Sequence, residues 1–285
     1  MLSQPALPRS FLYVPGNNPG LFPKAAAGKA DAVILDLEDA VPAAEKESAR
    51  AAVASWLSRA GNAAGGPKWW VRVSPETLAE DLTAVASEQL SGIVVAKCST
   101  AGLQHAEELV RKLEDAGRLI PGAVRLIGLL EDAGALLEAE AIPQLGRLAT
   151  YGIGEVDLLA DLRIARLPET DGAIDSLRTR VVVACAAAGL AAPLAPTSTD
   201  FRDLEAFEHS AVHLRSLGFR SRTAIHPGQV PVINSVFTPD ETDIQAAREL
   251  LERFTGAGSG VAVDAEGRFI DAAVVRAAQE TLDRA

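Results

Sequence analysis

Short apolar runs rich in valine, isoleucine and leucine recur along the chain, and longer stretches with helical spacing follow most of them. This alternation is typical of βα units around a parallel sheet. The seventh run contains Pro193, which is also compatible with a loop. The eight expected strands are Phe11–Val14, Ala32–Leu37, Trp69–Val73, Gly92–Ala96, Arg125–Leu130, Leu148–Ile153, Ala191–Ala195 and Arg222–Ile225.

Amphipathic stretches between these runs predict the connecting helices. Because no repeat or long linker interrupts the pattern, and a single α/β barrel commonly spans about 250 residues, we expect one (β/α)8 TIM barrel in residues 1–235. A C-terminal helical extension is expected in residues 236–285. The expected connecting helices are Pro42–Ser58, Thr77–Leu90, Ala101–Ala116, Thr170–Ala188 and Asp203–Leu217.

The C-terminal extension carries its own amphipathic pattern. Glu241–Phe254 has apolar residues at helical spacing, among them Ile244 and Leu251, so this helix needs a partner surface. The surface could belong to the same barrel or to a neighbouring subunit, and the pattern leaves both open.

Polar residues follow the predicted strands. In barrel enzymes the carboxyl ends of the strands converge on one site, so these side chains are expected to lie together. A doubly wound sheet is the alternative fold, but it would concentrate ligand groups at one switch point, and no G-x-G-x-x-G follows the first strand. The polar residues are Asn17, Asp36, Glu38, Asp39, Arg72, Lys97, Glu131, Asp157, Asp200, Arg202 and His226.

Composition excludes several classes of protein. The 38 acidic and 27 basic residues give a net charge of −11, which is unfavourable for binding nucleic acid. Cys98 and Cys185 are the only cysteines and form no C-x-x-C pair, so a reducing compartment is expected. No signal peptide or apolar stretch of about 18 residues is present, so we expect a cytoplasmic protein without a membrane partner.

Several fragments of the chain resemble the citrate lyase beta subunit-like members of the HpcH/HpaI aldolase superfamily, and they occur in the same order as in that family. Each fragment alone is a weak signal, whereas the ordered set is specific and spans nearly the whole chain. The fragments are Arg9–Asn17, Ala32–Val41, Val71–Val73, Val94–Lys97, Leu129–Ala133, Gly154–Leu158, Thr199–Asp203 and Ile225–Gln229.

The resemblance implies a (β/α)8 barrel with a C-terminal extension, assembled as a homotrimer or homohexamer. It implies cleavage or formation of citryl-, malyl- or citramalyl-thioesters, with a coenzyme A thioester and a 2-oxo acid as partners. By the same resemblance Glu131 and Asp157 hold a magnesium ion, and Glu131 and Arg72 contact the substrate. Tyr13 and Lys24 match positions that contact coenzyme A.

A further family element is found at Gly267–Asp271, where relatives use the aspartate as an acid/base in a neighbouring subunit's site. Asp271 is also a favourable N-cap for a helix over Ala272–Leu282, and both roles can hold together. Two positions depart from the family pattern. Asp132 adds a carboxylate beside Glu131, and Gly20 replaces a lysine that some relatives carry.

The chemistry of the residues agrees with these roles. Magnesium prefers oxygen ligands and is commonly held by one or two carboxylates, as Glu131 and Asp157 could supply. The Arg72 guanidinium could hold a carboxylate or an enolate oxygen by two hydrogen bonds. Asp36, Glu38 and Asp39 crowd one strand end, where we expect them to orient Arg72 or metal-bound water.

The sequence therefore predicts a magnesium-dependent carbon–carbon lyase acting on an acyl-CoA. Three alternatives remain open. The chain could be a citrate lyase subunit that acts on an acyl carrier protein thioester, a metal-dependent aldolase for free pyruvate-type acids, or a non-catalytic metabolite-binding relative. The sequence does not indicate which acyl group the substrate carries.

Overall fold

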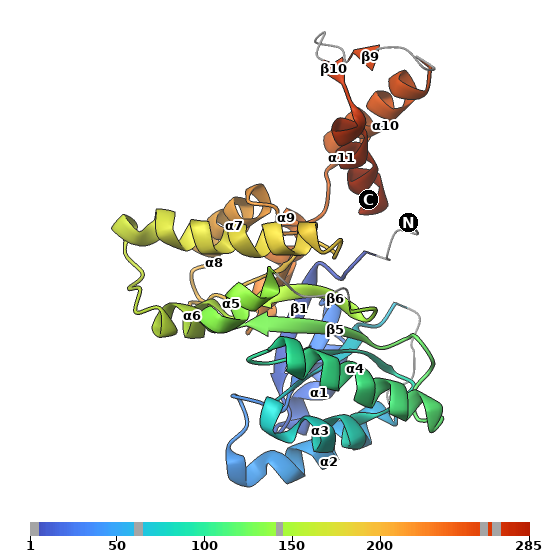
Figure 1. Ribbon diagram of the computed structural model, residues 1–285, viewed down its shortest axis with the longest axis vertical. Coiled ribbons are helices and arrows are strands. Elements are labelled where there is room, and N and C mark those ends of the chain that lie inside the picture. The colour runs from blue at the N-terminus through green and yellow to red at the C-terminus, as the bar shows by residue number, and fades with distance from the viewer. Residues whose placement is uncertain (1–5, 60–64, 141–144, 257–261, 264–268) are drawn as a thin grey trace. The chain divides into compact units, whose positions relative to one another are not determined.

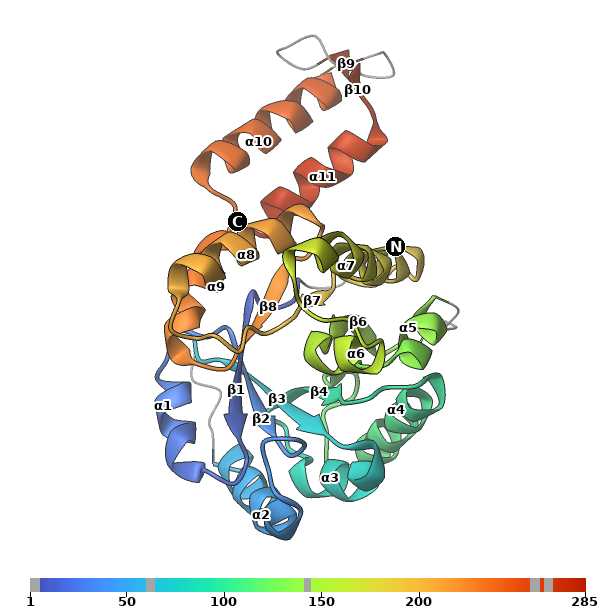
Figure 2. The same cartoon turned by 90° about the vertical axis from the view of Figure 1, so that its left-hand side faces the viewer.

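A computed structural model describes residues 6–59, 65–140, 145–256, 262–263 and 269–285. Eight parallel strands pair in sequence order, and β8 pairs with β1 to close the barrel. The predicted TIM barrel is therefore confirmed, and Figure 2 shows its helices surrounding the strands. The strands are β1 Ser10–Pro15, β2 Ala32–Asp36, β3 Lys68–Val73, β4 Leu90–Val95, β5 Arg125–Leu130, β6 Leu148–Ile153, β7 Leu194–Ala195 and β8 Ser221–Ala224.

All eight predicted strands are present, but the seventh is much shorter than expected. β7 spans only Leu194–Ala195, whereas the apolar pattern predicted Ala191–Ala195. Pro193 has no N–H to donate to a neighbouring strand, so regular pairing begins only after it. The Ala191 N–H still donates to the Ala149 carbonyl at 3.0 Å, which guides the chain into the barrel.

The longer helices lie where the sequence predicted them, except that the helix expected over Thr77–Leu90 ends at Val85. There Ala86 leaves helical geometry at φ −57° and ψ 116°. The shorter helices were not predicted, because one or two helical turns contain too few residues to show a periodic pattern of apolar positions. The helices up to residue 236 are α1 Phe22–Ala26, α2 Lys46–Leu57, α3 Leu78–Val85, α4 Thr100–Asp115, α5 Ala133–Ala139, α6 Glu155–Asp161, α7 Asp171–Ala187, α8 Leu204–Ser216 and α9 Val230–Val236.

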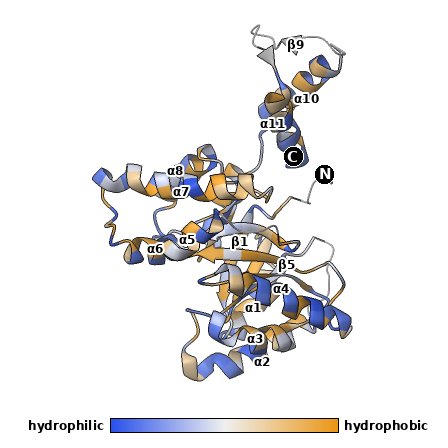
Figure 3. Cartoon of the chain, in the orientation of Figure 1, coloured by the Kyte–Doolittle hydropathy of each residue, from blue (hydrophilic) through white to orange (hydrophobic). Residues whose placement is uncertain are grey.

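The inside of the barrel is filled by apolar side chains from the strands. Figure 3 shows apolar colouring along much of β5 and mixed colouring on the helices around the barrel. Trp70 packs edge-on against Phe11 with ring centroids 5.5 Å apart. A Cβ at Gly92 would lie 2.2 Å from the Trp70 ring, so only glycine fits beside this tryptophan.

The contacts divide the chain into two compact units, one of Leu7–Asn234 and one that contains Ser235–Ala285. In the second unit, α10 (Glu241–Gly256) packs against α11 (Ala272–Asp283), as Figure 1 shows. Between them, β9 (Ala262–Val263) pairs antiparallel with β10 (Phe269–Ile270). No helix in the described ranges is long and apolar enough to cross a membrane.

Candidate active site

A cavity of about 220 Å³ lies among residues from the carboxyl ends of the strands. Several residues predicted for the site line it, while Lys24, Glu38 and Asp39 do not, and Asp271 belongs to the second compact unit. Glu38 and Asp39 contact residues that do. The predicted residues that line the cavity are Tyr13, Asp36, Arg72, Glu131 and Asp157.

Arg72 at the end of β3 is held by Asp36 at the end of β2. Its Nε and Nη2 donate to the two Asp36 carboxylate oxygens at 2.7 and 2.6 Å, which is a bidentate pair. Glu38 lies 3.2 Å from Nη1, and Asp39 lies 3.9 Å from it. Burial alone would lower the pKa of Arg72, but the bonds to Asp36 raise it above its usual value. The guanidinium is therefore a fixed positive charge at the cavity wall.

Tyr13 and Lys24, the two positions matched to coenzyme A contacts, lie in different environments. The Arg72 guanidinium carbon stands 5.0 Å from the centre of the Tyr13 ring, a cation–π contact at the cavity wall. Burial raises the pKa of the Tyr13 hydroxyl, so it is a neutral donor. Lys24 lies exposed on α1, outside the lining of the cavity.

Glu131 follows β5 and is only 4% exposed. Burial raises its pKa to about 7, and the charges of Glu38 and Asp157 act in the same direction, against the Lys97 N–H and Arg72. Gly154 makes room for it, since a Cβ there would lie 2.3 Å from the Glu131 Cγ. A bulkier residue at 154 would displace this carboxylate.

Lys97 connects two of the acids. Its main-chain N–H donates to Glu131 Oε2 at 2.7 Å, and its Nζ donates to Glu38 Oε1 at 2.8 Å. The hydrogen bond to Glu38 raises the pKa of Lys97. The lysine thus neutralises Glu38 and not Glu131.

Asp157 corrects one expectation. It was assigned to a strand end, but β6 ends at Ile153 and Asp157 lies in the first turn of α6. The residue is exposed and lines the cavity. A helix start favours an acidic side chain, because the main-chain N–H groups there carry partial positive charge.

Sequence reasoning missed Glu155. This buried carboxylate lines the cavity and receives Nε and Nη2 of Arg178 at 2.6 and 2.8 Å and Nη2 of Arg166 at 2.6 Å. Burial would raise the pKa of Glu155, but these arginines lower it. The pairing ties α6, which carries Asp157, to α7. The only sequence signal was an acid two residues before Asp157.

Asp132 and Asp271 both cap helices. Asp132 was expected to add a carboxylate beside Glu131, but it accepts the Ala135 N–H at 2.8 Å and caps α5. Asp271 accepts the N–H groups of Ala273 and Val274 at 2.8 and 3.0 Å, which confirms its predicted capping role for α11. Gly267 and Arg268 of the same motif lie outside the described residues.

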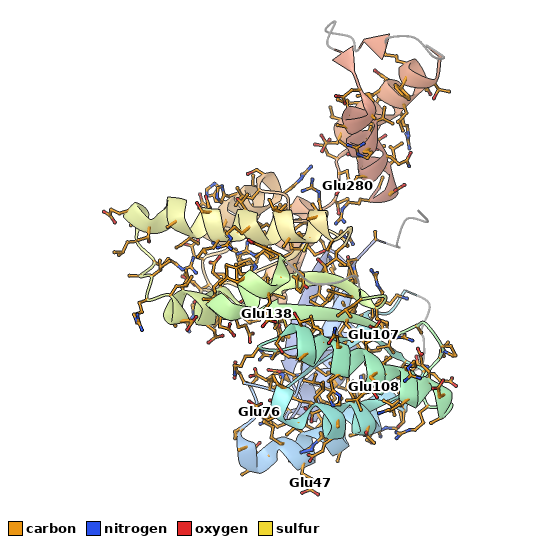
Figure 4. All side chains as sticks on the ribbon, in the orientation of Figure 1. Glu47, Glu76, Glu107, Glu108, Glu138 and Glu280 are labelled. Carbon is orange, nitrogen blue, oxygen red and sulfur yellow. The ribbon has the colours of Figure 1, made fainter. Side chains whose placement is uncertain are left out.

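Most of the acidic excess lies away from this cavity. Figure 4 labels acids on the outer helices, among them Glu47 on α2 and Glu108 on α4. Glu108 pairs with Lys112 at 2.7 Å on the helix surface. The cavity acids differ because two of them, Glu131 and Asp157, form no ion pair in the described part of the chain.

The donor set around Glu131 and Asp157 fits magnesium. Both groups offer carboxylate oxygens, and burial together with the charges of Glu38 and Asp157 raises the pKa of Glu131, which a bound cation would offset. The described residues contain no group of three or more metal-ligating side chains. Water and substrate oxygens would therefore complete the coordination, as is usual for magnesium.

A (β/α)8 barrel with its charged cavity at the carboxyl ends of the strands has the architecture of barrel enzymes. The model of the HpcH/HpaI aldolase/citrate lyase family matches residues 9–227. The chain belongs to this family.

Curated relatives match over almost their whole length. A citrate lyase subunit beta-like protein of Deinococcus radiodurans is 32% identical, covering 99% of both chains. An L-malyl-CoA/beta-methylmalyl-CoA lyase of Cereibacter sphaeroides is 31% identical over 97% of this chain and 95% of its own. The crystal structure of CitE from Mycobacterium tuberculosis with magnesium, acetoacetate and coenzyme A is 27% identical, with a TM-score of 0.74 and 97% of each chain covered.

Proposed function

We propose that this protein is a magnesium-dependent carbon–carbon lyase that cleaves or forms a β-hydroxyacyl-CoA, with an acyl-CoA and a 2-oxo acid as the other partners. The observation that carries the proposal is the single cavity shared by Glu131, Asp157 and Arg72. The malyl-CoA lyase relatives and the CitE complex with magnesium and coenzyme A support it.

In the cleavage direction, the hydroxyl proton is removed and the hydroxyl becomes the carbonyl of the 2-oxo acid. The adjacent carbon–carbon bond breaks, and its electron pair forms the enolate of the thioester, which then takes a proton at carbon. Magnesium on Glu131 and Asp157 would supply Lewis-acid charge for the hydroxyl and carboxylate oxygens.

Arg72 stabilises the negative charge that develops during this reaction. Its guanidinium has five N–H donors, and the contacts with Asp36 and Glu38 leave donors for one ligand group. Because Asp36 fixes its orientation, no reorganisation is needed when the enolate forms. Glu38 and Asp39 act through Arg72 and Lys97, which they contact.

Asp271 is the proposed proton carrier. Both capping bonds go to its Oδ1, and no contact of Oδ2 is found among the described residues, so the cap and proton transfer are compatible. We propose a barrel domain in residues 1–235 and an extension in residues 236–285 that brings Asp271 to a neighbouring subunit. A homotrimer or homohexamer in the cytoplasm would satisfy this arrangement.

A citrate lyase subunit that acts on an acyl carrier protein thioester is the second candidate. A citrate lyase subunit beta of Leuconostoc mesenteroides, 30% identical over 97% of this chain, favours it. Tyr13 and Lys24, which we assign to coenzyme A, favour the first candidate.

Incubation with malyl-, citramalyl- and citryl-CoA, with and without magnesium, tests the proposal. Release of an acyl-CoA and a 2-oxo acid from one of them, only with magnesium, is the expected result. Turnover of acyl carrier protein thioesters alone would select the second candidate. Turnover of free acids alone would indicate an aldolase, and no turnover of any of these would leave the metabolite-binding alternative.

A further inference from the structure

The cavity is poor in positive charge. Four carboxylates line it, and Arg72 is the single lysine or arginine among its described lining residues. Asp36 already occupies two donors of this guanidinium and Glu38 lies against a third nitrogen. Arg72 can therefore bind only one anionic group of a ligand.

Four other cations, Arg222, Lys97, Arg166 and Arg178, are held by partners of their own. Arg222 on β8 is buried, donates to Pro196 O and Ser210 Oγ at 3.1 and 2.9 Å, and stacks on the Phe207 ring at 3.9 Å. Lys97 donates to Glu38.

Arg166 and Arg178 both pair with Glu155. None of these four cations lines the cavity. With magnesium held by Glu131 and Asp157 and bound to the first ligand carboxylate, a second ligand carboxylate would find no lysine or arginine free to pair with it among the described lining residues.

Apolar side chains form the part of the cavity next to the barrel core. Leu129 and Leu194 belong both to the core cluster and to the cavity lining. Gly152 lies between them, since a Cβ there would be 2.7 Å from Leu129 Cδ2 and 3.5 Å from the Leu194 Cβ. Ile153 and Ala195 continue this surface beside the proposed metal ligands.

The candidate thioesters differ in the substituent on the hydroxyl carbon. That carbon bears the hydroxyl and the carboxylate assigned to the metal on Glu131 and Asp157, so its substituent also lies inside the cavity. In malyl-CoA the substituent is hydrogen, in citramalyl-CoA a methyl group, and in citryl-CoA a second carboxylate on a methylene.

We propose that the site accepts a β-hydroxyacyl thioester whose hydroxyl carbon carries hydrogen or a methyl group, and rejects one that carries a second carboxylate there. The apolar surface accommodates the first kind, whereas a desolvated carboxylate without a cation is strongly unfavourable. The 2-oxo acid partner is then a monocarboxylate. This inference rests on the proposed lyase function.

The test compares kcat/KM for malyl-, citramalyl- and citryl-CoA with magnesium present. We expect the kcat/KM of the better of the first two substrates to exceed that of citryl-CoA by about 100-fold or more, because burying a charge without a partner has a free-energy cost of this size. A kcat/KM for citryl-CoA within about tenfold of the value for the better substrate would overturn this inference. The proposed lyase function would still hold.

A binding measurement decides the inference even if no thioester is cleaved. Calorimetry of the magnesium-loaded protein should show pyruvate or glyoxylate binding about 100-fold more tightly than fresh oxaloacetate. Oxaloacetate binding as tight as that of pyruvate, or tighter, would contradict the proposal.

Two substitutions of one cavity residue, one charged and one uncharged, test the same surface. Thr197 lines the cavity and is half-buried, so Thr197→Lys adds a cation there and Thr197→Met is its uncharged control of similar length. Thr197→Lys should raise the kcat/KM ratio of citryl- to citramalyl-CoA by about tenfold relative to Thr197→Met, through one new ion pair. Equal ratios in the two variants would count against the missing cation as the cause of rejection.

Discussion

The main-chain N–H of Lys97 donates to Glu131 Oε2 from a left-handed backbone conformation, with a φ of +43°. Non-glycine residues rarely adopt this region, and such strain is commonly found at functional sites. The conformation aims the N–H at a proposed metal ligand while the side chain reaches Glu38. Lys97 therefore orients Glu131 through its backbone.

This relationship predicts different effects of two substitutions at Lys97. Glycine adopts a positive φ readily, so Lys97→Gly should keep the magnesium Kd within about threefold of wild type. Lys97→Val places a β-branched residue in the same conformation and should weaken binding about tenfold, the equivalent of 1–2 kcal/mol of strain. Magnesium titration by calorimetry measures both, and similar Kd values for the two variants would refute a role for the backbone conformation.

Glu131→Gln should lose metal binding and gain stability. Its pKa of about 7 in the folded state exceeds the usual 4.5, so above pH 7 the buried charge lowers the free energy of unfolding by about 3 kcal/mol. Without metal at pH 8, the glutamine variant should therefore be more stable by about 1–3 kcal/mol. Denaturant unfolding checks this, and a less stable variant would show that the carboxylate is not an uncompensated charge.

Magnesium affinity should depend on pH in a defined direction. Because the folded protein binds an extra proton at Glu131 between pH 4.5 and about 7, stability without metal falls as pH rises through this window. Metal binding requires the carboxylate, so affinity should rise about tenfold per pH unit below pH 7 and level off above it. Calorimetric titrations from about pH 5.5 to 8.5 measure the slope, and a flat profile would contradict the assignment.

Arg72→Ala should lower kcat by about 100- to 1000-fold, the usual loss for a donor at a developing oxyanion. Arg72→Lys should recover little of this loss, because an ammonium cannot form the two-bond pair with Asp36. Magnesium binding in both variants should stay close to wild type. A wild-type kcat in Arg72→Ala would remove the arginine from the mechanism.

Asp271→Asn separates the two roles of this residue. Asparagine caps helices about as well as aspartate, so the melting temperature should change little while turnover is lost. If the residue acts across a subunit interface, mixing Asp271→Asn with Glu131→Gln under subunit exchange should restore part of the activity. Full activity of Asp271→Asn alone would leave only the capping role.

Several site residues could be predicted because they end strands whose apolar runs are unambiguous. Glu131 follows β5 and Arg72 lies near the end of β3, so the barrel pattern brought both to one cavity. Asp157 was predicted for the site but placed on the wrong element. Asp157 lies four residues after Ile153, on α6, and this helix is too short to show a periodic pattern in the sequence.

Other parts of the site depend on contacts that no local pattern encodes. Glu155 pairs with Arg166 and Arg178, which lie 11 and 23 residues away on a different part of the chain. That pairing exists only because the folded chain brings Arg166, in the segment after α6, and Arg178, on α7, to the Glu155 carboxylate. The left-handed conformation of Lys97 is likewise set by its neighbours and not by its own preference.

A magnesium titration of the metal-free protein decides whether Glu131 and Asp157 form a metal-assisted lyase site. The measured quantity is the rate of 2-oxo acid release from malyl- or citramalyl-CoA. The wild type should show saturable activation by magnesium, whereas Asp157→Asn should be activated only at a much higher magnesium concentration. Release at the full rate in the presence of a chelator, or identical magnesium curves for wild type and Asp157→Asn, would contradict this assignment.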